Sequence, residues 1–153
     1  MAEIAYQKQK LHIAITILVM AIIFLHSAMP GDLSSAGSNI IVRLVTGLTQ
    51  LPDETVSLIT RKTAHFTEYM ILGICFAVNV WDWKRKRSAD LSGVKMVAIP
   101  WLLSSLYAVT DEIHQAFVPD RACALMDVGI DSAGALFGCI MILIIWKNSR
   151  RVK

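Results

Sequence analysis

The sequence predicts an all-α membrane protein with four transmembrane helices, and three observations support this fold class. The chain of 153 residues is 55% hydrophobic and only 18% charged, with a mean hydropathy of +0.54. A water-soluble domain of this length could not bury so large an apolar excess in its core. Four apolar stretches approach the roughly 20 residues that span a hydrocarbon layer as a helix. Lys and Arg residues gather at the ends that these stretches would share on one side of a membrane.

The four predicted spans comprise residues 11–29, 64–81, 94–113 and 128–146. The first and last are almost uninterrupted apolar runs, whereas the middle two carry ionisable residues near one end. With three Cys, eight Gly and four Pro, the composition excludes disulfide-stapled, collagen-like and disordered proteins. We treat residues 1–153 as a single transmembrane domain.

The first span could instead be a signal peptide, because Lys8 and Lys10 precede it. Its apolar run is at the long limit for a signal peptide, so we interpret it as a retained spanning helix. His12 and His26 lie at its two ends without polar neighbours in the sequence, and we expect both at the membrane interfaces.

The distribution of basic residues predicts the orientation of the chain. Eleven Lys and Arg residues lie in the two terminal segments and the second connection, whereas the first and third connections hold four. Because positively charged residues are retained on the cytoplasmic side, both termini are predicted to be cytoplasmic. The basic run at residues 84–87 is interpreted as a topology anchor near anionic lipid rather than a nucleic-acid site.

The first external connection, residues 30–63, is too long for a tight turn. Its apolar residues recur three and four positions apart, which predicts a short amphipathic helix lying on the outer interface. These residues are Ile40, Ile41, Leu44, Val45 and Leu48. Pro52, Asp53 and Glu54 then favour a helix start, compatible with a helix that continues through Arg61 into the second span.

Polar residues converge at the outer end of the second span. Arg61, His65 and Glu68 share one helical stripe, with Lys62 and Tyr69 adjoining, because residues three, four and seven apart lie on one face. A carboxylate at the depth of Glu68 is costly without a partner.

The third and fourth spans bring further polar residues to the same level. Tyr107, Asp111, His114 and Gln115 share one face at the end of the third helix. The fourth helix is predicted to open with Asp127 as its N-cap and to carry Asp131 one turn further in.

Two glycines, Gly134 and Gly138, continue the stripe of Asp131. Their spacing allows close helix approach in lipid, which would carry Asp131 inward. The same face could also support a homo-oligomer.

Each polar residue also has a structural interpretation. Arg61 could be an interface anchor whose stem snorkels along lipid. His65 and Glu68 could form a hydrogen-bonded pair that joins two helices. Asp127 could be a cap alone. Cys75 falls inside an apolar span and is expected to act as a small hydrophobe.

The number of ionisable residues within or beside the spans favours a site nevertheless, because such residues are rare in membranes and usually functional. The set includes cations suited to phosphate or carboxylate, and imidazole and carboxylate groups suited to proton transfer. The residues therefore predict a polar site at the outer leaflet whose ligand is an anionic headgroup.

Three blocks of sequence resemble the VanZ-like family of small bacterial membrane proteins. They are RKTAHFTEY at residues 61–69, YAVTDEIHQAF at 107–117 followed by Pro119 and Arg121, and DVGIDSAGALFG at 127–138. The blocks have the order and spacing of the family and cover about residues 61–140. One departure is Asp120, where the family usually has glycine, and an acid there could partly neutralise Arg121.

The resemblance implies a role in the bacterial cell envelope, linked to low-level resistance to the glycopeptide teicoplanin, in the cytoplasmic (inner) membrane. It supplies no established reaction. The positions that carry the motif are expected to form the site, with proposed catalytic residues His65, Glu68, Asp111 and His114, and substrate-binding residues Lys62, Glu112, Gln115, Arg121, Asp127 and Asp131.

Three functional hypotheses follow. In the first, the site binds or processes an anionic lipid or lipid-linked envelope precursor, without a cofactor, metal or nucleic acid. In the second, the pairs His65 with Glu68 and Asp111 with His114 hold a divalent metal in a membrane enzyme. In the third, the protein is a transporter or scaffold whose buried ion pairs only fix helix packing.

Overall fold

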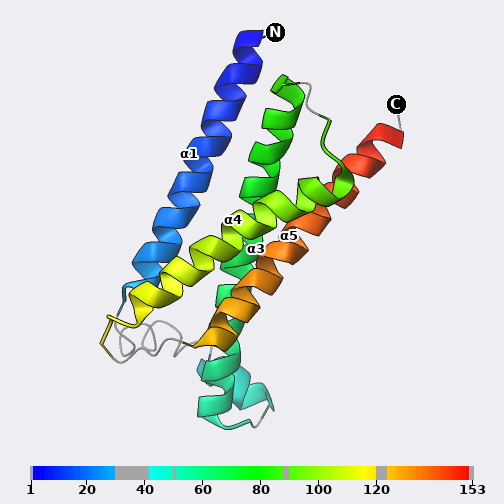
Figure 1. The fold of residues 1–153 in the computed structure, drawn as a ribbon. Coiled ribbons are helices and arrows are strands. Elements are labelled where there is room, and N and C mark those ends of the chain that lie inside the picture. The colour runs from blue at the N-terminus through cyan, green and yellow to red at the C-terminus, as the bar shows by residue number, and fades with distance from the viewer. Residues whose placement is uncertain (1, 30–41, 50, 88–89, 120–123, 152–153) are drawn as a thin grey trace.

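The structure is a computed structural model that describes residues 2–29, 42–49, 51–87, 90–119 and 124–151 (Figure 1). Its long helices are α1 (Ala2–Ser27), α3 (Asp53–Arg87), α4 (Gly93–Gln115) and α5 (Leu125–Arg151). Residues 42–49 are also helical, and no strand occurs within the described ranges. The predicted all-α fold is confirmed.

Three of the helices are long and apolar enough to cross a membrane, over Tyr6–Ser27, Gly93–Gln115 and Leu125–Ser149. The chain is thus a multi-helix integral membrane protein. The remaining predicted span, residues 64–81, lies within α3. This helix is not among the three that are apolar enough by the same measure, so its span stays a prediction. Helix α3 touches α1, α4 and α5, so its polar groups can face protein rather than lipid.

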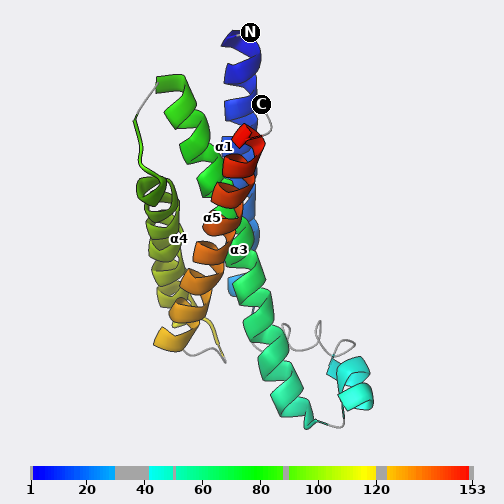
Figure 2. The same cartoon turned by 90° about the vertical axis from the view of Figure 1, so that its right-hand side faces the viewer.

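The two ends of the bundle carry different parts of the chain (Figures 1 and 2). The start of α1, the end of α3 and the end of α5 lie together, and we call this the terminal end. The end of α1, the end of α4 and the start of α5 lie at the opposite, distal end. Both termini therefore lie at one end, as four spans require. Which end faces the cytoplasm remains a prediction.

Helices α3 and α5 pack backbone against backbone through glycines. A Cβ atom at Gly134 would collide with the carbonyl oxygen of Phe66, and one at Gly138 with that of Met70. Gly73 of α3 meets the backbone of α5 in the same way. Such close approach increases van der Waals contact, which drives helix association in lipid. The face that carries Gly134 and Gly138, which could have supported a homo-oligomer, is thus buried against α3 of the same chain.

Two histidine–carboxylate pairs join α1 to α3, one toward each end of their seam. His12 Nδ1 lies 2.6 Å from Asp82 Oδ2, and His26 Nδ1 lies 2.7 Å from Glu68 Oε1. The histidines are as far apart along α1 as the acids are along α3, as antiparallel helices in register require. The sequence around the two histidines did not reveal these partners, because they come from a distant part of the chain. The interfacial position expected of both histidines stays a prediction.

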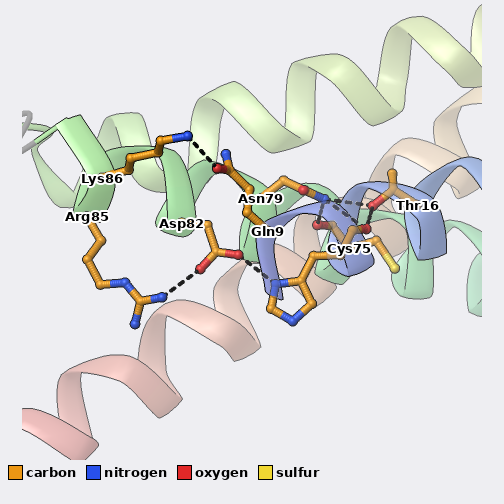
Figure 3. Close-up of polar contacts among 8 residues, drawn as sticks. Gln9, Thr16, Cys75, Asn79, Asp82, Arg85 and Lys86 are labelled. Atoms are coloured by element: carbon orange, nitrogen blue, oxygen red, sulfur yellow. Dashed lines mark hydrogen bonds and ion pairs between the residues drawn. The ribbon is translucent and has the colours of Figure 1, made fainter. Parts of the chain in front are cut away.

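Figure 3 shows the terminal half of this seam. The Asn79 side-chain amide donates to Thr16 Oγ1 at 2.7 Å and to the Cys75 carbonyl at 2.9 Å. Arg85 approaches the second carboxylate oxygen of Asp82 at 3.3 Å. Lipid offers no hydrogen-bond partners, so these contacts with neighbouring residues explain why α3 can carry polar side chains.

The predicted amphipathic helix in the first connection is confirmed as a helix over residues 42–49. It lies beside the first turns of α3 (Figure 2), with Val42 buried and Leu48 85% exposed. Ile40 and Ile41 lie outside the described residues. Helix α3 begins at Asp53 and continues unbroken to Arg87, as the sequence suggested.

Candidate functional site

An ion pair between α3 and α5 forms the rim of the predicted site. Lys62 Nζ donates to Asp127 Oδ1 at 2.5 Å, and Arg61 lies 3.9 Å from the other carboxylate oxygen. The prediction that Asp127 is the N-cap is wrong, because α5 begins at Leu125 and Asp127 lies in its first turn. Both predicted cations of the second span therefore share one carboxylate.

A second acid–base pair lies one turn deeper. His65 Nδ1 is 3.5 Å from Asp131 Oδ1, and the two side chains are 9% and 1% exposed. This separation is within ion-pair range and at the limit of hydrogen bonding, so the two groups interact but make no hydrogen bond of good geometry. His65 thus faces α5, whereas Glu68 points to His26 on α1. The suggested pair of His65 with Glu68 is replaced by two pairs that join α3 to different helices.

The end of α4 contributes two buried acids to the same region. Asp111 Oδ2 accepts from the Gln115 amide at 3.4 Å, and Glu112 Oε1 accepts from the backbone N–H of Ala124 at 2.6 Å. His114 instead stacks on Phe24 of α1, with ring centroids 4.5 Å apart. The suggested pairing of Asp111 with His114 is not observed.

Seven side chains from all four long helices share one feature: each has a buried nitrogen or oxygen that meets no partner at good hydrogen-bond distance and angle among the described residues. We call this set the distal cluster; it comprises Ser27, His65, Tyr69, Asp111, Glu112, His114 and Asp131. Ser27 and Tyr69 nevertheless lie near Asp111, and His65 lies near Asp131. His65 is a near electrostatic neighbour of all three acids. Tyr69, which is fully buried, lies close to Asp111 and Asp131.

The concentration of these atoms is unusual. Native proteins leave few buried polar groups unpaired, and each costs about 1–3 kcal/mol. Eight of the ten such atoms in the described part of the chain belong to the distal cluster. A solvated or ligand-binding site explains them better than a sealed core does.

The cluster favours particular chemistry. Four of the eight atoms are carboxylate oxygens of Asp111, Glu112 and Asp131, which accept hydrogen bonds when ionised. A ligand group that enters should therefore donate, as hydroxyl and amine groups do. His65 can accept and return a proton, and the Asp131 carboxylate 3.5 Å away stabilises the protonated ring.

The metal hypothesis loses its structural basis in the described residues. No group of three or more His, Cys, Asp or Glu side chains within them could hold a metal ion. The two helical pairs on which the hypothesis depended are split, because Glu68 turns to α1 and His114 stacks on Phe24.

The sequence analysis missed one member of the distal cluster, Ser27. Two other residues of the predicted site cannot be placed in the structure. Ser27 comes from the end of α1, and only its position in the last turn of an apolar span could have indicated it. Arg121, predicted to bind substrate, and Asp120, expected to partly neutralise it, lie outside the described residues.

These features define a small helical membrane protein with a polar site buried between helix ends. The chain belongs to the VanZ/LLP1 family, whose model matches residues 12–146. The match extends beyond the three motif blocks and includes residues 12–27 of α1, the part that supplies His26 and Ser27. No curated protein and no solved structure matches the chain.

Proposed function

We propose that the chain binds the headgroup of an anionic lipid or lipid-linked cell-wall precursor in the distal cluster, at the outer face of the bacterial cytoplasmic membrane. The observation that carries this proposal is the concentration of buried polar atoms without well-formed hydrogen bonds, where the ends of α1 and α4 and the start of α5 meet the middle of α3. Buried polar groups in a membrane are expensive, and a ligand that pairs with them recovers that cost.

The orientation follows from charge. The segments at the terminal end hold eleven Lys and Arg residues, and those at the distal end hold four. The positive-inside rule then places the distal cluster at the outer leaflet.

The basic rim and the acidic distal cluster beneath it favour a headgroup that carries both a phosphate and hydrogen-bond donors. At the rim, a phosphate could displace the Asp127 carboxylate from Lys62 and Arg61, since both cations suit phosphate. Deeper in the cluster, hydroxyl or amine groups would donate to Asp111 and Asp131. A phosphate attached to a glycan or polyol meets both requirements.

Processing of the headgroup would use His65 as the proton acceptor, with the nearby Asp131 carboxylate stabilising the protonated ring. A His65→Gln variant is then expected to retain the ligand and to lose turnover. If the protein binds the headgroup without processing it, cells that carry the wild type and cells that carry His65→Gln should have the same lipid composition.

Two tyrosines provide a matched test. Tyr69 has a buried hydroxyl that lies near Asp111 but makes no hydrogen bond of good geometry, whereas the Tyr107 hydroxyl donates to the Met20 carbonyl at 2.7 Å. Tyr69→Phe should therefore leave folding intact and weaken a ligand that bonds this hydroxyl. Tyr107→Phe should cost about 1 kcal/mol of stability and spare the ligand.

The measurement is native mass spectrometry of protein extracted with its own lipids, for wild type, both tyrosine variants and Lys62→Ala. We expect an anionic lipid or precursor on wild type and Tyr107→Phe, and little on Tyr69→Phe or Lys62→Ala. The proposal fails if the wild type carries no such molecule, or if all four proteins carry it equally.

The family resemblance extends the proposal to glycopeptide resistance. Expression in a susceptible bacterium is expected to raise the teicoplanin concentration needed for inhibition, and Tyr69→Phe to reverse that rise. If resistance persists in the Tyr69→Phe and Lys62→Ala variants, it does not depend on ligand binding in the distal cluster.

A further inference from the structure

An open groove between α4 and α5 lies at the terminal end of the bundle, away from the distal cluster. Its volume is about 510 Å³, within the roughly 300–1,000 Å³ of pockets that hold small molecules. Val94, Val97 and Ala98 from the first turns of α4 and Leu143 from α5 line it. Its walls are therefore largely hydrocarbon.

The packing of α5 explains why this groove is present. Trp146 stacks on Trp81 of α3, with ring centroids 4.3 Å apart and planes 20° apart. This contact holds the last turns of α5 against α3, while Leu143 and Lys147 border the space toward α4. On the α4 side, Ala98 is too small to fill that space.

Trp101 adds apolar surface to the groove. Its indole N–H donates to the backbone carbonyl and hydroxyl of Ser132, at 3.1 and 3.0 Å. The polar edge of the ring is thus already paired, and an occupant of the groove would meet its hydrocarbon surface.

The rim of the groove is basic. Lys147 lines it and makes no hydrogen bond or ion pair within the described part of the chain. Of the acids at this end, Asp82 is engaged by His12 and Arg85, and neither Glu3 nor Asp90 lines the groove. Further basic residues at the same end are Lys84, Lys86, Arg87 and Lys95. Basic pockets between membrane helices bind anionic headgroups.

We propose that this groove binds one anionic phospholipid, with its phosphate on Lys147 and an acyl chain along Val97, Ala98 and Leu143. Apolar burial alone selects weakly between lipids, because bilayer chains are as apolar as the groove. Charge therefore sets the preference, and each basic contact contributes about fivefold in affinity.

The test is a native mass spectrometry titration of the detergent-purified full chain with palmitoyl-oleoyl phosphatidylglycerol and, separately, palmitoyl-oleoyl phosphatidylcholine. Both titrations use the Tyr69→Phe background, so that ligand in the distal cluster does not contribute. Lys147→Gln removes the proposed contact with the phosphate. It disrupts no hydrogen bond or ion pair within the described part of the chain. Ala98→Phe fills the groove, and Lys95→Gln removes a nearby exposed lysine that does not line it.

We expect one phosphatidylglycerol to bind at concentrations where phosphatidylcholine does not. Lys147→Gln should weaken that binding about fivefold, Ala98→Phe should abolish it, and Lys95→Gln should change it by less than twofold. Equal binding of the two lipids would overturn the proposal. So would equal effects of Lys147→Gln and Lys95→Gln, or unchanged binding to a folded Ala98→Phe protein.

Discussion

Substituting Gly134 by Ala tests the backbone contact that holds α3 and α5 together. The added Cβ would overlap the carbonyl oxygen of Phe66, and a backbone atom cannot move aside as a flexible side chain can. Overpacking of this kind costs about 1–3 kcal/mol, occasionally more. Because the obstacle is backbone and the helices must separate, we expect a loss near 3 kcal/mol, at the upper end of that range.

Gly129 provides the control, since it lies in the same helix and a Cβ there would meet no atom within 4 Å. Gly129→Ala should change stability by between zero and a gain of about 1 kcal/mol, the difference in helix propensity. Gly138→Ala, facing the Met70 carbonyl, should behave like Gly134→Ala.

The assay is equilibrium unfolding in mixed micelles of dodecyl maltoside and dodecyl sulfate, followed by circular dichroism. Lipid retention is measured on the same samples, because separating α3 from α5 also separates His65 from Asp131. If Gly134→Ala and Gly129→Ala unfold at the same detergent composition, the described contact between the two helices is refuted.

Two further predictions concern contacts that the structure adds to the sequence analysis. A double-mutant cycle with His12→Ala and Asp82→Asn should give a coupling energy of about 1–3 kcal/mol in unfolding, and strictly additive changes would contradict the observed pair. Glu112→Ala should lower stability by about 1–3 kcal/mol, since the Ala124 N–H loses its acceptor, whereas Glu112→Gln keeps an acceptor oxygen and should cost less in the same assay.

The sequence predicted most of the fold because hydropathy and helical periodicity are local properties. The apolar runs of α1, α4 and α5 need no knowledge of their neighbours. Helix α3 is harder to predict as a membrane span, because its polar residues can lie in a membrane only where other helices cover them. Its unbroken course from Asp53 to Arg87 was still indicated by Pro52 and the acids that follow it.

The faces of the site were predictable, but the pairs across helices were not. Spacing of three and four residues placed Asp111 and Gln115 on one face, and they interact. The same spacing suggested His65 with Glu68, yet these side chains lie far enough apart around α3 to meet different neighbours. Which neighbour each meets depends on how α1 and α5 are arranged around α3, and no pattern within one helix contains that information.

Hydrogen bonding separates two roles that the same residue types play in this chain. His12 with Asp82 and His26 with Glu68 are paired at 2.6 and 2.7 Å, so their polar atoms serve to attach α1 to α3. His65 and Asp131 are more deeply buried than either histidine of those pairs, and their ring nitrogen and carboxylate oxygen lie 3.5 Å apart, at the limit of hydrogen bonding. A structural pair offsets its burial by a short hydrogen bond, and the contact of His65 with Asp131 is too long to do so fully. Their burial is therefore best explained by a group that enters from outside the chain, which is why the distal cluster rather than the α1–α3 seam is the place to look for the ligand.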